Sequence, residues 1–199
     1  MKTTIKHLGI FLVFAVFAGN TSAQNSNQWM LDKDHTSVNF AVNHFFSTVN
    51  GNFTEFSGNF QFDPDNLKAS SFEFTIPVSA ISTNNEKRDG HLKSEDFFNA
   101  SKYPNIKFKS TGFEKRGKNK YIVNGNLIIK DVTKKVAIPF EITGEMEHPM
   151  MRGTTILGLS FKTSLDRSAY GVGTGDWASD MVVGDNVEIA VNMELNKKG

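Results

Sequence analysis

The segment 79–110, SAISTNNEKRDGHLKSEDFFNASKYPNIKFKS, separates two runs in which apolar and polar residues alternate. The alternation is clear over residues 71–76 before it and over residues 105–109 after it, as expected for strands with one buried face. Between these runs the period of two is lost. The segment therefore predicts one long connection in a chain that otherwise consists of strands.

Capping residues predict short helices within this connection. Asn84 or Asn85 can cap a helical turn over residues 86–92, and Ser94 can accept hydrogen bonds from the backbone of a second turn. We therefore expect one short helical crossing over about residues 84–99. Connections of this length often carry function.

The rest of the chain is predicted to form an all-β domain. Apolar residues recur at every second position in five further segments, 38–42, 121–129, 136–142, 157–165 and 187–195. The aromatic residues of 51–62 change parity between Phe53 and Phe56, which predicts a bulge or bend near Thr54 and Glu55. Short turns between most strands favour antiparallel neighbours, and about eight strands close most readily into a lipocalin-like β-barrel, filled or hollow.

The first residues are typical of a secretory signal peptide. Lys2 and Lys6 precede an apolar run over residues 8–18, and small residues at Thr21 and Ala23 predict cleavage after Ala23. The apolar run is shorter than the about 20 residues needed to span a bilayer. We expect a signal peptide at 1–23, one domain at 24–199, a periplasmic or secreted location, and no integral membrane span after cleavage.

Composition excludes several classes of protein. The absence of cysteine rules out a disulfide framework and lipoprotein attachment. Without residues 1–23 the net charge changes from +1 to −1, and the longest basic cluster, residues 115–120, lies where a hairpin turn is expected. A nucleic-acid partner is therefore not expected, because neutralising phosphates requires clustered lysine and arginine.

The crossing also carries a long motif shared with a known family. It resembles the YceI-like family of secreted, lipocalin-like, polyisoprenoid-binding proteins, at Ser79, Ile81, Thr83, Arg88, Asp89, His91, Leu92, Ser94, Asp96, Phe97, Phe98, Tyr103, Pro104, Ile106, Phe108 and Ser110. Segments 32–44, 51–58, 125–136 and 166–171 are similar to other blocks of that family. Ala169 departs from the pattern, because the family more often has an acidic residue beside Arg167. The resemblance implies a barrel that binds an apolar isoprenoid or fatty lipid.

We expect the ligand to contact inward-facing apolar side chains and polar groups at the rim. The candidate ligand-binding residues are Phe40, Val42, His44, Phe74, Arg88, His91, Phe97, Phe108, Leu127, Phe140, Phe161 and Arg167. Fifteen of the eighteen phenylalanines follow residue 23, and smooth aromatic walls suit a long hydrocarbon, although a simple packed core is the alternative.

Two arginines have two interpretations each. Arg88 either presents its guanidinium to an anionic head group or pairs with Asp89 to hold the crossing against the barrel. Arg167 follows Asp166 and is open to the same two readings.

Neither a metal site nor a catalytic site is expected. A metal set of His35, His44, His91, Asp34 and Asp89 lacks the spacing of a known zinc motif. No nucleophile elbow or ordered catalytic triad is present, so we expect no cofactor and no enzyme.

The leading hypothesis is therefore binding, sequestration or transport of an apolar lipid in the cell envelope. One alternative is a filled barrel that acts in stress response or adhesion through an exposed apolar patch near Ile122 and Ile128. Another is an enzyme acting on a lipid head group at the barrel mouth. The oligomeric state is left open, with a homodimer among the alternatives.

Overall fold

The computed structural model describes residues 28–199, so the predicted signal peptide lies outside the described residues. The strands are β1 (Gln28–His44), β2 (Ser47–Phe53), β3 (Ser57–Gln61), β4 (Ser71–Pro77), β5 (Ile81–Ser82), β6 (Asn105–Gly117), β7 (Lys120–Ile129), β8 (Val132–Glu147), β9 (Thr154–Asp166) and β10 (Val183–Lys198). The helices are α1 (Glu86–Lys93) and four short 3₁₀ turns, Leu67–Ala69, Val78–Ala80, Ser168–Tyr170 and Gly175–Trp177.

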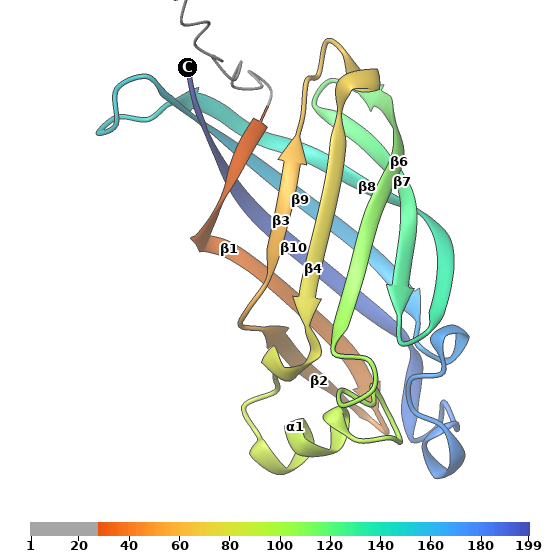
Figure 1. Ribbon diagram of the computed structural model, residues 1–199. Coiled ribbons are helices and arrows are strands. Elements are labelled where there is room, and N and C mark those ends of the chain that lie inside the picture. The colour runs from red at the N-terminus through yellow and green to blue at the C-terminus, as the bar shows by residue number, and fades with distance from the viewer. Residues whose placement is uncertain (1–27) are drawn as a thin grey trace, which may run out of the picture.

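The strands form one antiparallel sheet that closes on itself (Figure 1). Eight strands close the barrel in the order β1-β3-β4-β6-β7-β8-β9-β10, and β10 pairs back onto β1. Strands β2 and β5 extend the sheet from the second half of β1. The predicted eight-strand barrel is confirmed. Its long strands correspond to the segments in which apolar and polar residues alternate in the sequence.

The predicted change of parity also appears in the structure. Strands β2 and β3 are separated by residues 54–56, where the backbone leaves the ladder and the amide of Thr54 donates to the carbonyl of Ala80 (2.9 Å). The bend lets Phe53 and Phe56 both reach the interior, where each is buried.

The helical crossing is confirmed in its first part and differs in its second. Asn85 caps α1 by accepting a hydrogen bond from the amide of Arg88 (3.0 Å). The side chain of Ser94 does not cap the following turn as predicted, because its Oγ has no partner and the carbonyl of Ser94 accepts from Phe97 instead (3.2 Å). Turns rather than a second helix therefore lead on toward β6.

The barrel interior is packed at one end and hollow at the other. An aromatic plug fills the packed end and consists of Phe62, Phe72, Phe113, Tyr121 and Phe140. Its neighbouring rings lie 4.9–6.3 Å apart, and Phe140 stacks on Tyr121 with 21° between the ring planes. Such spacing is that of favourable aromatic pairs.

Three glycines allow phenylalanine rings to lie flat against the barrel wall. A Cβ atom at Gly51 would stand 2.3 Å from the ring of Phe40, and one at Gly125 would stand 2.5 Å from the ring of Phe108. At Gly58 the ring of Phe60 approaches in the same way. Each ring therefore occupies the space over a glycine that a side chain would fill at any other residue.

This arrangement predicts opposite effects for two alanine substitutions. Gly125→Ala should lower the free energy of unfolding by about 1–3 kcal/mol, because the new methyl group meets a ring and the carbonyl of Lys109 at 2.6 Å. Gly144→Ala, which has no atom within 4 Å of its Cβ position, should be neutral or stabilise by about 0.4–1 kcal/mol. Urea unfolding measures both, and equal effects of the two substitutions would contradict this account.

Candidate ligand-binding cavity

A hollow of about 230 Å³ lies between the aromatic plug and the crossing that contains α1. A single water molecule needs roughly 10–15 Å³ measured in this way, so the space is a true cavity rather than a packing defect. The lining is almost entirely apolar. The alternation in the sequence was compatible with a filled or a hollow barrel, and at this end of the molecule the barrel is hollow.

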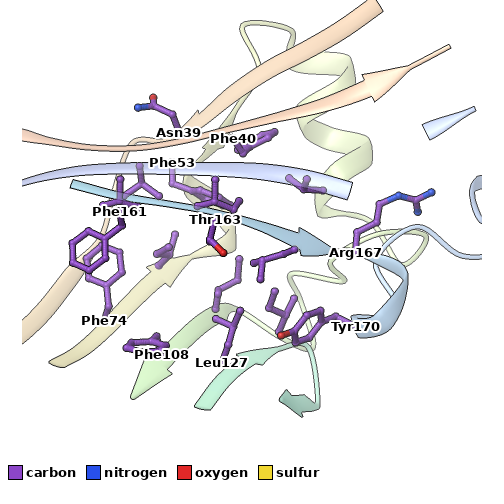
Figure 2. Close-up of a pocket in the computed structure, with 18 of the residues that line it drawn as sticks. Asn39, Phe40, Phe53, Phe74, Phe108, Leu127, Phe161, Thr163, Arg167 and Tyr170 are labelled. Carbon is purple, nitrogen blue, oxygen red and sulfur yellow. The ribbon is translucent and has the colours of Figure 1, made fainter. Parts of the chain in front are cut away.

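The cavity wall follows from strand alternation. On β9 the side chains of Phe161 and Thr163 point into the cavity (Figure 2). Leu165 also lines it, while Lys162 and Ser164 are exposed. The crossing closes one end of this space with Leu92, Phe97 and Phe98. A segment that follows β9 adds Tyr170 and Val172.

Most of the candidate residues named from the sequence lie in this wall. Those that line the cavity are Phe40, Val42, Phe74, Phe97, Phe108, Leu127, Phe161 and Arg167. Six of them occupy inward positions on strands of the hollow half, whereas Phe97 lies on the crossing and Arg167 directly after β9.

Four candidates lie elsewhere, and each has a different environment. Phe140 belongs to the aromatic plug and stacks on Phe161 at 5.1 Å. His44 ends β1 and packs against the ring of Phe45. His91 pairs with Asp96 (3.0 Å). The exposed Arg88 turns back onto its own crossing.

The sequence interpretation missed part of the wall. Val187, Ile189 and Val191 of β10 line the cavity together with Tyr170 and Val172. The three β10 residues share the inward parity of their strand, so alternation already contained a signal for them. Alternation did not mark Tyr170 and Val172, because they lie outside the strands, although Tyr170 stands in the segment 166–171 that resembles a block of the family.

Arg88 supports the crossing through Thr83. Its Nε donates to the Thr83 hydroxyl (2.7 Å) and its Nη2 donates to the Thr83 carbonyl (2.9 Å). Asp89 accepts from the amide and the hydroxyl of the same threonine, which is buried. Arg88 and Asp89 therefore both bind Thr83 instead of each other. This arrangement corresponds to the interpretation in which the two residues hold the crossing against the barrel, with Thr83 between them.

Arg167 is almost fully buried and its guanidinium is saturated with main-chain acceptors. It donates to the carbonyls of Val172 (2.8 Å), Gly173 (3.1 Å), Val183 (2.6 Å) and Gly184 (3.0 Å). Nη2 also lies 3.2 Å from the Asp185 carboxylate. In Figure 2 the guanidinium points away from the phenylalanines. Arg167 thus joins the segment after β9 to the start of β10.

The histidine and aspartate residues considered as a metal set, and not expected to form one, do not come together as a group in the described chain. Within residues 28–199, the group of potential metal ligands that does come together is Asp32, His35 and Glu194, on the outside of the barrel. Among the helices of the described residues, none has the length and apolarity to cross a membrane.

Sequence comparison now places this barrel among known proteins. The profile of the YceI-like domain matches residues 29–195. The chain belongs to the YceI-like family. A UPF0312 protein of Vibrio cholerae is 33% identical to it over 175 residues, which cover 86% of this chain and 89% of that protein. Another, from Photorhabdus laumondii, is 40% identical over 116 residues, 58% of this chain and 60% of that protein.

Solved structures have the same architecture as this YceI-like protein. BcnA of Burkholderia cenocepacia superposes with a TM-score of 0.73 at 28% identity, over 82% of this chain and 98% of that chain. The YceI protein of Campylobacter jejuni gives 0.71 at 30% identity, over 77% and 88%. A polyisoprenoid-binding domain from Saccharophagus degradans gives 0.63 at 10% identity, over 87% and 99%, which shows a shared fold.

Because Arg167 is buried and Arg88 is exposed, we expect their substitution to lower the free energy of unfolding by different amounts. Arg167→Gln should destabilise the protein by several kcal/mol, because each hydrogen bond from a charged group contributes about 1.5–3 kcal/mol and buried carbonyls lose their donors. Arg88→Gln should cost about 1 kcal/mol, since its side chain is exposed. Thermal and urea unfolding measure the difference, and an Arg167 variant as stable as the Arg88 variant would argue against the structural role of Arg167.

Proposed function

We propose that this YceI-like protein binds the hydrocarbon chain of an isoprenoid or fatty lipid in the cavity, and sequesters or carries that lipid in the cell envelope. The observation that carries the proposal is a hollow, apolar half-barrel beside a densely packed one. The polyisoprenoid-binding domain of Saccharophagus degradans has the same fold, which supports this ligand class. The envelope location rests on the predicted signal peptide.

The expected affinity is modest and comes from the chain. Burial of a methylene group is worth about 0.8 kcal/mol, but ligands of this size realise only about 0.3 kcal/mol per heavy atom after ordering costs. A chain of about 20 carbons therefore contributes about 6 kcal/mol, which corresponds to a dissociation constant of tens of micromolar.

The alternatives have less support. A filled barrel conflicts with the cavity, and its proposed surface marker is weak because Ile122 and Ile128 are half-buried. Catalysis on a head group would need polar chemistry facing the cavity, whereas the lining is nearly all carbon.

Obstructing the cavity tests the proposal directly. Thr163→Phe places a ring into the hollow and should weaken binding of geranylgeraniol at least tenfold, measured by calorimetric titration. Ser164→Phe is the matched control, because Ser164 is the next residue on β9 and faces outward. Unchanged affinity in a folded Thr163→Phe variant, or equal loss in both variants, would contradict binding in this cavity.

The setting of the arginines predicts weak discrimination between head groups. Arg88 is bound to Thr83 and Arg167 to main-chain carbonyls, so neither guanidinium is free to pair with a phosphate inside the cavity. Geranylgeraniol and geranylgeranyl phosphate should bind within about threefold of each other. Arg88→Gln should change both affinities alike, whereas selective loss of the phosphate ligand would assign Arg88 to head-group recognition.

A further inference from the structure

The outer surface of the barrel carries a second feature where β1 meets β10. Asp32 pairs with Glu194 across the ladder, and pairing resumes at Ser37 with Asn192, so residues 33–36 stand opposite one residue of β10. This insertion is the sharp corner of β1 in Figure 1. Bulges of this kind redirect side chains and are enriched near functional sites.

Side chains within the bulge hold it in shape. Asp32 Oδ1 accepts from the amides of Asp34 (3.1 Å) and His35 (3.2 Å). The hydroxyl of Thr36 accepts from the amide of Glu194 (3.2 Å), which replaces the ladder bond lost at the bulge. As a result His35 folds back over Asp32 instead of pointing along the strand.

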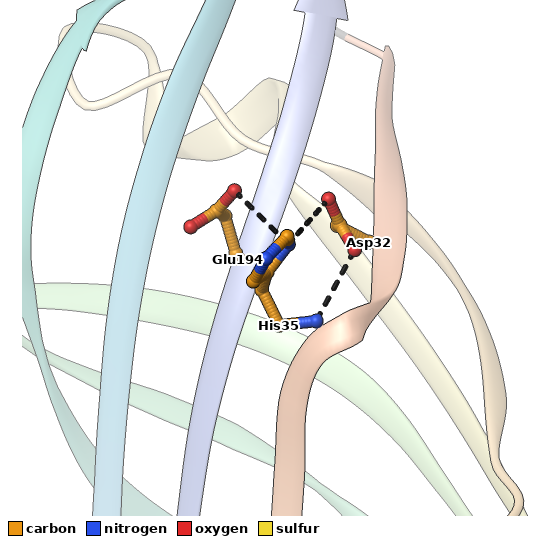
Figure 3. A group of neighbouring side chains, drawn as sticks. All are labelled: Asp32, His35 and Glu194. Atoms are coloured by element: carbon orange, nitrogen blue, oxygen red, sulfur yellow. Dashed lines mark hydrogen bonds and ion pairs between the residues drawn. The ribbon is translucent and has the colours of Figure 1, made fainter.

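The bulge brings one imidazole and two carboxylates together (Figure 3). His35 Nδ1 lies 3.1 Å from Asp32 Oδ2 and 3.9 Å from Glu194 Oε1, and the candidate ligand atoms all lie within 4.8 Å of one another. Two ligand atoms on a tetrahedral zinc ion, with bonds of about 2.0–2.2 Å, are roughly 3.3–3.5 Å apart. Small side-chain rotations therefore suffice to place all three on one ion.

A buried amide beside the cluster supplies an independent indication. Asn196 is 9% exposed, although Met193 and Leu195 face inward and alternation would turn Asn196 toward the surface. Its Nδ2 donates to Asp32 Oδ2 (3.3 Å), while its Oδ1 is buried without a partner. Buried polar atoms without partners are uncommon and call for an explanation. A half-turn of the amide places the oxygen toward Asp32, as a fourth ligand.

We propose that Asp32, His35 and Glu194 form a zinc site on the outside of the barrel, with the Asn196 oxygen as the fourth ligand. Imidazole and carboxylate groups are common ligands of Zn²⁺, which usually binds four ligands in a tetrahedral arrangement. The ion would join the first and last strands at the point where the barrel closes. The site is separate from the lipid cavity, so neither proposal depends on the other.

A proton is the competing occupant of this cluster. The hydrogen bond with Asp32 raises the pKa of His35 above its ordinary value, and the charges of Asp32, Glu194 and Asp34 act in the same direction. Because a metal-bound imidazole must be deprotonated, zinc and a proton compete for the same ring nitrogen of His35.

Calorimetric titration of the purified protein with zinc chloride tests the site. We expect one equivalent to bind in the micromolar range at pH 7.5 and to raise the melting temperature, since the ion binds only the folded chain. His35→Gln and Glu194→Gln should each lower the affinity at least tenfold. His148→Gln is the control, because His148 lies on the turn between β8 and β9 and not in the cluster.

Two outcomes would overturn the zinc site. One is the absence of saturable one-to-one binding in the parent protein. The other is parental affinity in His35→Gln or Glu194→Gln, with circular dichroism confirming that each variant is folded. Zinc affinity lost equally in His148→Gln would also reject it, because the binding would then be general to histidine.

Discussion

The pairing of β1 with β10 is the constraint on which the rest of the structure depends. It joins the first and last strands of the described chain over registers from Met30–Asn196 to His44–Val183 and so converts an open sheet into a barrel. An eight-strand barrel has an interior just wide enough for side chains or one small ligand. After closure, each part of the interior is either filled by side chains or left hollow. In this chain the aromatic plug fills one half of the barrel and the other half is hollow.

The hollow half persists because its polar groups are used elsewhere. The guanidinium of Arg167 donates to four main-chain carbonyls, and that of Arg88 donates to Thr83. These two cations hold the crossing and the segment after β9 in place, and neither directs its charge into the cavity. Glycines at positions 51, 58 and 125 let the rings of Phe40, Phe60 and Phe108 lie close to the wall. The cavity lining is therefore almost entirely apolar, which suits a hydrocarbon better than a charged ligand.

Much of the fold could be predicted from local pattern, whereas the site could be predicted only in part. Alternation identifies which face of a strand is buried, but it does not show how far along the barrel axis an inward-facing residue lies. Phe140 and Phe161 share the inward parity and stack on each other, yet only Phe161 lines the cavity. The direction of the Arg88 side chain depends on the crossing turning back to Thr83. Glu194 meets Asp32 only through barrel closure, so the spacing of the histidines could not indicate that cluster.

On the proposed function, the hollow half of the barrel holds an apolar chain in the cell. Mass spectrometry of an organic extract of the protein, purified without detergent from the cells that produce it, tests this most directly. We expect one class of long-chain apolar lipid at close to one molecule per chain, and none in an extract of the Thr163→Phe variant, in which the cavity is filled. An extract without lipid, from protein that also binds none on titration, would contradict it.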